Sequence, residues 1–129
     1  MTSPLAISSL YLALLGLMFI PFTLRVGAYR LRNNIPLGDG GDSELLKRIR
    51  AQANFVETVP LAILLITAME LAGAGSAWLH TLGTLLVIGR LSHYLQITGV
   101  LQPLAFRSGG MFMTLATYLV APIWLLMHL

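Results

Sequence analysis

One short stretch of the chain, RIRAQANFVETVP (residues 48–60), carries three polar side chains at helical spacing. Arg50, Asn54 and Glu57 are separated by four and three residues, so a helix would place them within about 60° of one another. Lys47 joins the same stripe one turn earlier. Such a stripe offers charged donors and acceptors either to a bound ligand or to neighbouring helices.

The stripe runs directly into an apolar segment, LAILLITAM (residues 61–69). At 1.5 Å per residue, Glu57 lies roughly 20 Å along a helix that begins at Glu44. A charged group at the centre of a membrane costs about 2.5–3.5 kcal/mol even on a lenient scale. We therefore expect Glu57 to face protein or trapped water.

A second polar face is expected on the helix that follows. Arg90, His93, Tyr94 and Ile97 follow the i, i+3, i+4, i+7 spacing of one helix face. In an antiparallel arrangement Arg90 reaches the depth of Glu57. Because each would otherwise be an unpaired charge in a medium of low dielectric constant, the sequence predicts a buried Glu57–Arg90 ion pair.

Positive charge is in excess near the end of the membrane where these helices meet. The donors there without matching carboxylates are Arg30, Lys47, Arg50, Tyr94 and Arg107. Guanidinium and ammonium groups bind carboxylates and phosphates. A pocket of this kind, half inside the membrane, favours an anionic ligand.

The composition places all of these residues in an integral membrane protein. Of the 129 residues 57% are hydrophobic and 10% are charged, with a mean hydropathy of +0.81, whereas soluble domains contain about 25% charged residues. The net charge is +3, but six of the eight basic residues lie between Arg25 and Arg50 and flank one loop. That clustering indicates membrane topology and not nucleic-acid binding. The chain has no cysteine, which excludes thiol catalysis by the protein.

The chain is expected to be all-α, a single transmembrane domain over residues 1–129 with four helices in an up-down bundle. The expected helices cover residues 4–32, 44–71, 77–101 and 111–128. The connections are short, so consecutive helices should be antiparallel neighbours. Asp42 or Ser43 and then Ser76 are expected helix caps. By the positive-inside rule, both termini lie outside the cytoplasm.

In its motifs the chain resembles the MAPEG family, the membrane-associated proteins in eicosanoid and glutathione metabolism, and especially its small bacterial branch. The matching stretches are RIRAQANFVETVP (residues 48–60), GRLSHYLQITG (residues 89–99) and FRSGG (residues 106–110). The resemblance covers essentially the whole chain. It implies a homotrimer in the bacterial inner membrane, with glutathione bound between adjacent subunits on the cytoplasmic side.

The resemblance also implies roles for individual residues. Glutathione as co-substrate would be bound by Arg50, Asn54 and Glu57, helped by Arg30 and Gln52. His93, Tyr94 and Ser108 would complete that site, and Arg107 would be the catalytic arginine that stabilises the thiolate. One residue departs from the pattern, because Ile97 stands where several members carry a second aromatic side chain.

The implied chemistry needs no metal and no nucleophile from the protein. A thiol has a pKa near 8.5, and a nearby guanidinium lowers it. The thiolate would attack a lipophilic small molecule dissolved in the bilayer. His80 and His128 lack the spacing of metal ligands and are expected at the outer membrane boundary. Glu70 is expected there as a solvated residue.

Two other functions are compatible with these residues. A small proton-coupled transporter would use the intramembrane Glu57 as its proton carrier. A glutathione-binding or lipid-anion-binding membrane protein without catalysis would use the same cationic pocket. A transporter should link substrate binding to proton release at Glu57, whereas a transferase should lower the pKa of the bound thiol.

Overall fold

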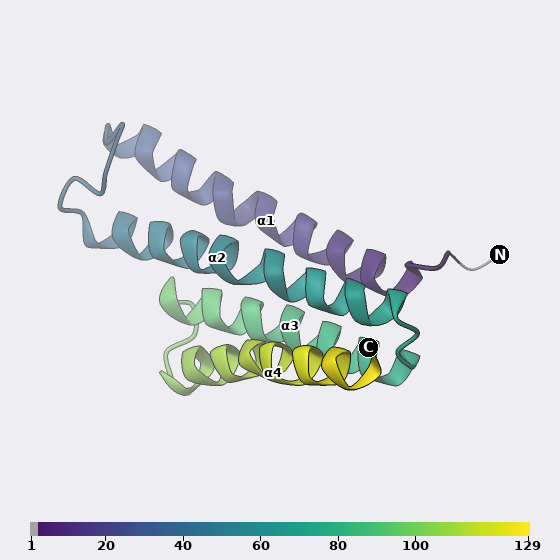
Figure 1. The fold of residues 1–129 in the computed structure, drawn as a ribbon. Coiled ribbons are helices and arrows are strands. Elements are labelled where there is room, and N and C mark those ends of the chain that lie inside the picture. The colour runs from purple at the N-terminus through teal and green to yellow at the C-terminus, as the bar shows by residue number, and fades with distance from the viewer. Residues whose placement is uncertain (1–2) are drawn as a thin grey trace.

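The computed structural model describes residues 3–129, which form four α-helices and no strand. The helices are α1 (Ala6–Asn33), α2 (Ser43–Leu71), α3 (Ser76–Ile97) and α4 (Ala105–His128). Consecutive helices run in opposite directions, and the two ends of the chain lie at the same end of the molecule (Figure 1). The all-α, four-helix prediction is confirmed.

The bundle is built around α2, which packs against each of the other three helices. The α3 helix also packs against α1, α2 and α4, whereas α1 and α4 do not touch. The hairpin of α1 and α2 extends beyond α3 and α4 at the end that holds the 34–42 loop (Figure 1). One flank of α2 is consequently left open at that end.

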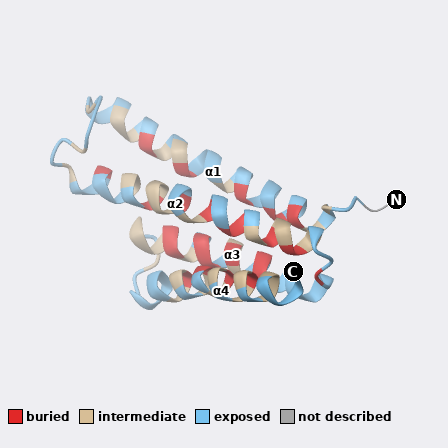
Figure 2. Cartoon of the chain, in the orientation of Figure 1, coloured by how far each residue is buried: buried red, intermediate tan, exposed pale blue. Residues whose placement is uncertain are grey.

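Three of the four helices, α1, α2 and α4, are long and apolar enough to cross a membrane. Apolar side chains such as Leu12, Leu17 and Leu24 of α1 are exposed, as lipid-facing residues would be. Figure 2 shows the buried residues on the inward sides of the helices and the exposed ones along the outside of α1. The α3 helix has 22 residues and buries its polar residues Arg90 and His93.

Aromatic side chains join α1, α2 and α3 near the middle of the bundle. The Phe22 ring of α1 stacks on Tyr94 of α3, with 3.5 Å between the ring centroids, and meets Phe55 of α2 edge-on at 5.2 Å. All three rings are buried. Aromatic contacts of this kind add to the stabilisation that comes from area burial, so the cluster fixes the positions of the three helices.

The loop between α1 and α2 is held by polar contacts at both of its ends. Asp42 caps α2, as predicted, by accepting a hydrogen bond from the backbone N–H of Leu45 at 3.0 Å. The Tyr29 hydroxyl donates to the same carboxylate at 2.9 Å. Arg30 donates to the carbonyl oxygen of Gly38 at 2.7 Å. Gly38 has a φ of 68°, a conformation that L side chains rarely adopt.

Two helix boundaries differ from the prediction at the connection between α3 and α4. The α3 helix ends at Ile97 and not at residue 101, because the Gly99 backbone (φ 82°) turns the chain and donates to the carbonyl of Gln96. The α4 helix begins at Ala105 and not at residue 111, after Pro103. Ser76 is also not a cap: α3 is preceded by Gly75, with no side-chain cap.

Glu70, expected as a solvated boundary residue, instead caps the first helix from a distance. Its carboxylate accepts hydrogen bonds from the backbone N–H groups of Ile7 at 2.9 Å and Ser8 at 2.7 Å, and from the Ser8 hydroxyl. Those N–H groups have no partner inside α1. The negative charge also suits the positive end of the helix dipole. The contact ties the start of α1 to the end of α2.

The Glu70 contact predicts a stability difference. We expect Glu70→Ala to lower the free energy of unfolding by about 1–3 kcal/mol, because buried N–H donors lose their acceptor. Glu44→Ala is the control, since it removes a half-exposed ion pair with Lys47 and should cost less than about 1 kcal/mol. Thermal unfolding in detergent measures both. If both variants lose the same free energy of unfolding, the role of Glu70 as a cap of α1 is contradicted.

The Asp42 cap predicts a dependence on pH. The Leu45 N–H and the Tyr29 hydroxyl lower the pKa of Asp42 below its usual value of 3.8. A carboxyl group whose pKa is lower in the folded than in the unfolded protein stabilises the fold. This stabilisation is complete above the pKa of the unfolded protein and is lost as the pH falls through the pKa of the folded protein. An asparagine at position 42 can still cap α2, but its side chain has no charge that depends on pH. The melting temperature of the wild type should therefore exceed that of Asp42→Asn at neutral pH, and the difference should shrink below about pH 4. A difference that stays constant down to pH 3 or so would contradict this.

Candidate functional site

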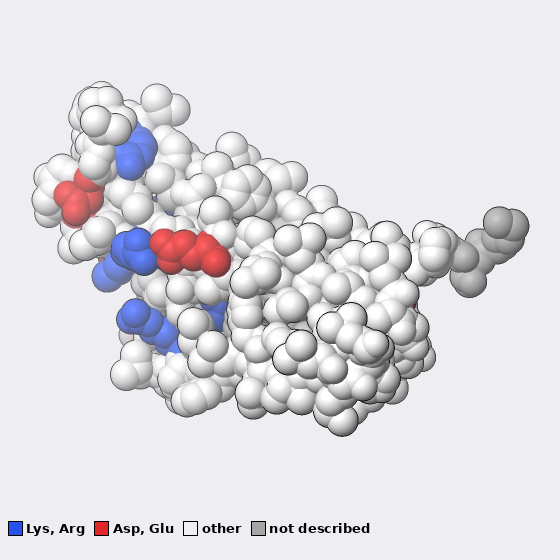
Figure 3. Space-filling view, in the orientation of Figure 1, with Lys and Arg blue, Asp and Glu red and all other residues white. Residues whose placement is uncertain are grey.

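Charged side chains gather at one end of the molecule, around the 34–42 loop and the connection between α3 and α4. In the view of Figure 3, Lys, Arg, Asp and Glu are seen toward that end, and the opposite end is free of them. Most of the charged side chains therefore lie at this end, along the open flank of α2, while Glu70 lies at the opposite end against the start of α1. The pattern agrees with the basic cluster in the sequence.

The deepest charge is the Arg90 guanidinium, which is only 2% exposed. Its Nη1 donates to the Asn54 side-chain oxygen and, at 3.2 Å, to the Thr58 hydroxyl, both on α2. Its Nη2 donates at 3.1 Å to the carbonyl oxygen of Gly110 on α4. Arg90 lies on α3, so one side chain connects three helices.

The predicted Glu57–Arg90 ion pair is wrong. Glu57 pairs instead with Arg50 at 3.7 Å, and both side chains are more than half exposed. Glu57 lies between the inward-facing Asn54 and Thr58 in sequence, but a rotation of about 100° from Thr58 turns it outward. Arg90 is bound by neutral oxygens instead of a carboxylate.

Two adjoining hollows lie at the charged end, and Arg107 lines both of them. The first, of about 370 Å³, is lined by residues of α2, α3 and α4: Asn54, His93, Leu104, Arg107, Ser108 and Met111. The second, of about 450 Å³, is lined by residues of the same helices and of the α3–α4 connection. Its polar and charged residues are Lys47, Arg50, Gln96, Gln102 and Arg107, and the others are Leu46, Ile97, Gly99 and Leu101. We call the two hollows together the cationic groove.

The groove brings together five of the residues that the resemblance implies for glutathione binding or catalysis: Arg50, Asn54, His93, Arg107 and Ser108. Glu57 joins them through its contact with Arg50. The groove also contains Gln96 and Gln102, which the sequence reasoning missed. Gln96 follows His93 by three residues, so the helical spacing could have identified it.

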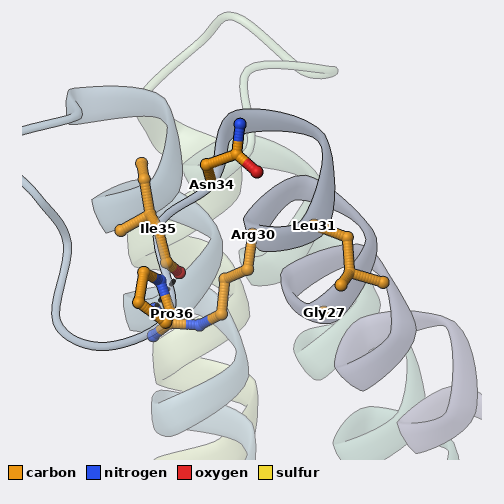
Figure 4. A pocket seen from close by; sticks show the side chains of 6 residues that line it. All are labelled: Gly27, Arg30, Leu31, Asn34, Ile35 and Pro36. Atoms are coloured by element: carbon orange, nitrogen blue, oxygen red, sulfur yellow. Dashed lines mark hydrogen bonds between the residues drawn. The ribbon is translucent and has the colours of Figure 1, made fainter.

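Three implied residues lie elsewhere in the chain. Gln52 donates to the Thr23 hydroxyl of α1 at 3.0 Å. Tyr94 stacks on Phe22, also on α1. Arg30 lines a hollow of about 580 Å³ at the end of α1 and reaches across to the loop at Ile35 and Pro36 (Figure 4). These three side chains face α1 and the loop, and not the cationic groove.

A close approach of α3 and α4 positions Arg107 beside His93. A methyl group on Gly89 would lie 2.7 Å from the Gly110 carbonyl oxygen, and one on Gly110 would lie 3.0 Å from the backbone nitrogen of His93. Neither position has room for a side chain. The paired glycines therefore let α4 begin directly against α3 and extend Arg107 and Ser108 over the groove.

No group of three or more potential metal ligands gathers among residues 3–129. His80 contacts the Tyr11 hydroxyl through Nδ1 at 3.0 Å. His128 contacts the carbonyl oxygen of Trp124 at 2.7 Å. Both histidines lie away from the groove, toward the opposite end of the bundle.

The close packing at Gly110 generates a prediction with a neighbouring control. Gly110→Ala should lower the free energy of unfolding by about 1–3 kcal/mol, because the added methyl group forces α3 and α4 apart. Gly109→Ala should be neutral or raise it by up to about 1 kcal/mol, because nothing lies within 4 Å of that position. Thermal unfolding in detergent distinguishes them. A Gly110→Ala protein as stable as Gly109→Ala would show that the helices are not in close contact.

Comparison with known proteins identifies the family of the chain. The model of the MAPEG family matches residues 8–127. The chain is also 41% identical over 88 residues, 68% of its own length and 67% of the relative's, to the inner membrane protein YecN of Escherichia coli strain K12, and equally to that of Escherichia coli O6:H1. No solved structure matches the chain significantly. With apolar helices, a buried polar network and a family match over nearly all of its length, the chain is an integral membrane protein that belongs to the MAPEG family.

Proposed function

We propose that the protein is a membrane-bound glutathione transferase-like enzyme. It binds glutathione in the cationic groove and activates the thiol toward lipophilic electrophiles or peroxides. The observation that carries this proposal is the position of Arg107, which lines both hollows of the groove. The family match supports it, because the resemblance to MAPEG proteins implies glutathione chemistry at these residues.

The charge of the groove suits glutathione, a tripeptide with two carboxylates, one ammonium group and a thiol. Lys47, Arg50 and Arg107 supply cations, and the Glu57 carboxylate beside Arg50 supplies an acceptor for the ammonium group. Arg107 forms no ion pair within residues 3–129. Its charge is therefore available to a ligand.

The chemistry follows from the charge of Arg107. The guanidinium favours the thiolate over the thiol at neutral pH, because it stabilises the anion next to it. The sulfur attacks the electrophilic atom of the second substrate, whose leaving group takes the bonding electrons. Apolar side chains of α4 such as Phe112, Leu115 and Leu119 line another hollow, of about 450 Å³, which offers a surface to a substrate dissolved in the bilayer.

The proposal includes a homotrimer in the bacterial inner membrane with both termini outside the cytoplasm. Arg50 and Glu57 are more than half exposed, and the exposed Leu61 and Leu64 continue their stripe along α2. Charged groups at this position need a protein cover in the membrane. Neighbouring subunits would supply that cover and would bring Arg30 and Gln52 of one subunit toward the groove of another. Tyr94, by contrast, is 3% exposed and stacks on Phe22, so it stays inside its own bundle. Native mass spectrometry tests the trimer.

The test of the proposed function is calorimetric titration of the purified protein in detergent with glutathione, together with the ultraviolet absorption of the thiolate. We expect binding with a thiolate signal in the wild type. Arg107→Ala should lose the thiolate signal and lower the reaction rate with a lipophilic electrophile at least tenfold. Arg32→Ala is the matched control, because it removes an exposed arginine at the end of α1 and should change neither reading.

The other outcomes decide between the alternatives. Binding of glutathione without a thiolate signal would contradict the transferase and support a protein that binds glutathione without catalysis. No binding at millimolar glutathione would contradict both. Proton release on substrate binding that Glu57→Gln abolishes would instead support the transporter.

A further inference from the structure

We infer that Arg90 is a positioning residue that fixes the Asn54 amide, so that its NH₂ group faces the cationic groove and donates to an acceptor oxygen of the ligand. The identity of the ligand rests on the proposed function. The orientation of Asn54 does not, because it follows from the contacts of the two side chains.

The chemistry of arginine determines which end of the Asn54 amide faces it. A guanidinium has donors and no acceptor, so only the Asn54 oxygen can bond to Nη1 of Arg90. The NH₂ group of a planar amide must then point away from Arg90. It forms no hydrogen bond with any residue in the described part of the chain, and it is not sealed inside the protein. Asn54 lines the hollow that contains His93 and Arg107, which leaves this donor free for a ligand.

The contacts around Arg90 hold this orientation firmly. The Thr58 hydroxyl donates to the backbone carbonyl of Asn54 at 2.7 Å and accepts from Arg90. The Tyr118 hydroxyl of α4 donates to the Thr58 carbonyl oxygen. Nη2 of Arg90 donates a hydrogen bond to the carbonyl oxygen of Gly110 at 3.1 Å. Arg90 is 2% exposed and lines neither hollow of the groove, so it does not contact a ligand there directly and its hydrogen bond to Asn54 links it to the groove.

The choice of asparagine at this position supports a binding role. A buried arginine is better neutralised by a carboxylate than by an amide, so aspartate at position 54 would improve the contact with Arg90. Aspartate, however, would present a second acceptor to the groove in place of the donor. Asparagine satisfies Arg90 and the ligand together, because it has an acceptor at one end of the amide and a donor at the other.

The two roles can be separated by comparing Asn54→Asp with Asn54→Ala. Asn54→Asp keeps the acceptor for Arg90 and should be at least as thermally stable as the wild type, but its affinity for glutathione should fall at least tenfold. Asn54→Ala should lose both stability and affinity. Titrations at low and high salt control for general repulsion by the new carboxylate, because salt screens a diffuse charge effect but does not restore a lost hydrogen bond.

Arg90 itself is tested by Arg90→Met in protein with ¹⁵N-labelled asparagine side chains. The Asn54 amide signal, assigned by its loss in Asn54→Asp, should shift and broaden in Arg90→Met, and glutathione affinity should fall about tenfold. Arg90→Lys keeps a hydrogen-bond donor, so its Asn54 amide signal and its glutathione affinity should both lie between those of Arg90→Met and the wild type. An unchanged amide signal in Arg90→Met, or wild-type affinity in Asn54→Asp, would overturn the inference. If the wild type binds no glutathione, the proposed function fails, while the amide signal and the order of melting temperatures still decide the role of Arg90.

Discussion

The structure depends on a guanidinium that is buried without a carboxylate. Removing a charge from water costs several kcal/mol, and the Arg90 side chain is almost completely buried. Asn54, Thr58 and Gly110 supply the oxygens that offset this cost. Because they come from α2 and α4 while Arg90 lies on α3, these three helices can only pack with Arg90 at their junction. The groove is built on the open side of the same junction.

The two ends of the bundle are fixed by different contacts. At the end away from the 34–42 loop, the Glu70 carboxylate of α2 accepts hydrogen bonds from the backbone N–H groups at the start of α1. At the charged end, Asp42 and Arg30 hold the loop between the two helices. The α1–α2 hairpin is thus closed at both ends by charged side chains. Of the charges that line the groove, Lys47 and Arg50 pair with Glu44 and Glu57, whereas Arg107 forms no ion pair within residues 3–129. The Arg107 guanidinium is therefore the group most available to a ligand.

The sequence predicted the elements well and their contacts less well. Apolar length and short connections were sufficient to predict four antiparallel helices, and the spacing of Arg50, Asn54 and Glu57 correctly indicated polar groups on this part of α2. Of the three, however, Asn54 faces Arg90 inside the bundle, whereas Arg50 and Glu57 are more than half exposed. Depth alone, however, could not pair Glu57 with the right arginine. The pairing depends on which side of each helix faces its neighbour, and Glu57 faces Arg50. Arg90 donates hydrogen bonds to neutral oxygens of Asn54 and Thr58, where a carboxylate was expected. The close approach of α3 and α4 depends on the contact of Gly89 with Gly110, which no local pattern reveals. Glu70 contacts a helix about sixty residues away in the sequence, so local sequence patterns could not predict its role as a cap.

The most direct test of this account is a distance between the thiol of glutathione and the arginines of the groove. Solid-state NMR of the protein in lipid bilayers can measure it, with ¹³C in the cysteine side chain of glutathione and ¹⁵N in the arginine guanidinium groups. The account predicts a short dipolar contact that disappears in Arg107→Lys prepared with unlabelled lysine and persists in Arg32→Lys. Bound glutathione whose labelled carbon has no guanidinium contact, or whose contact survives the loss of Arg107, would contradict it.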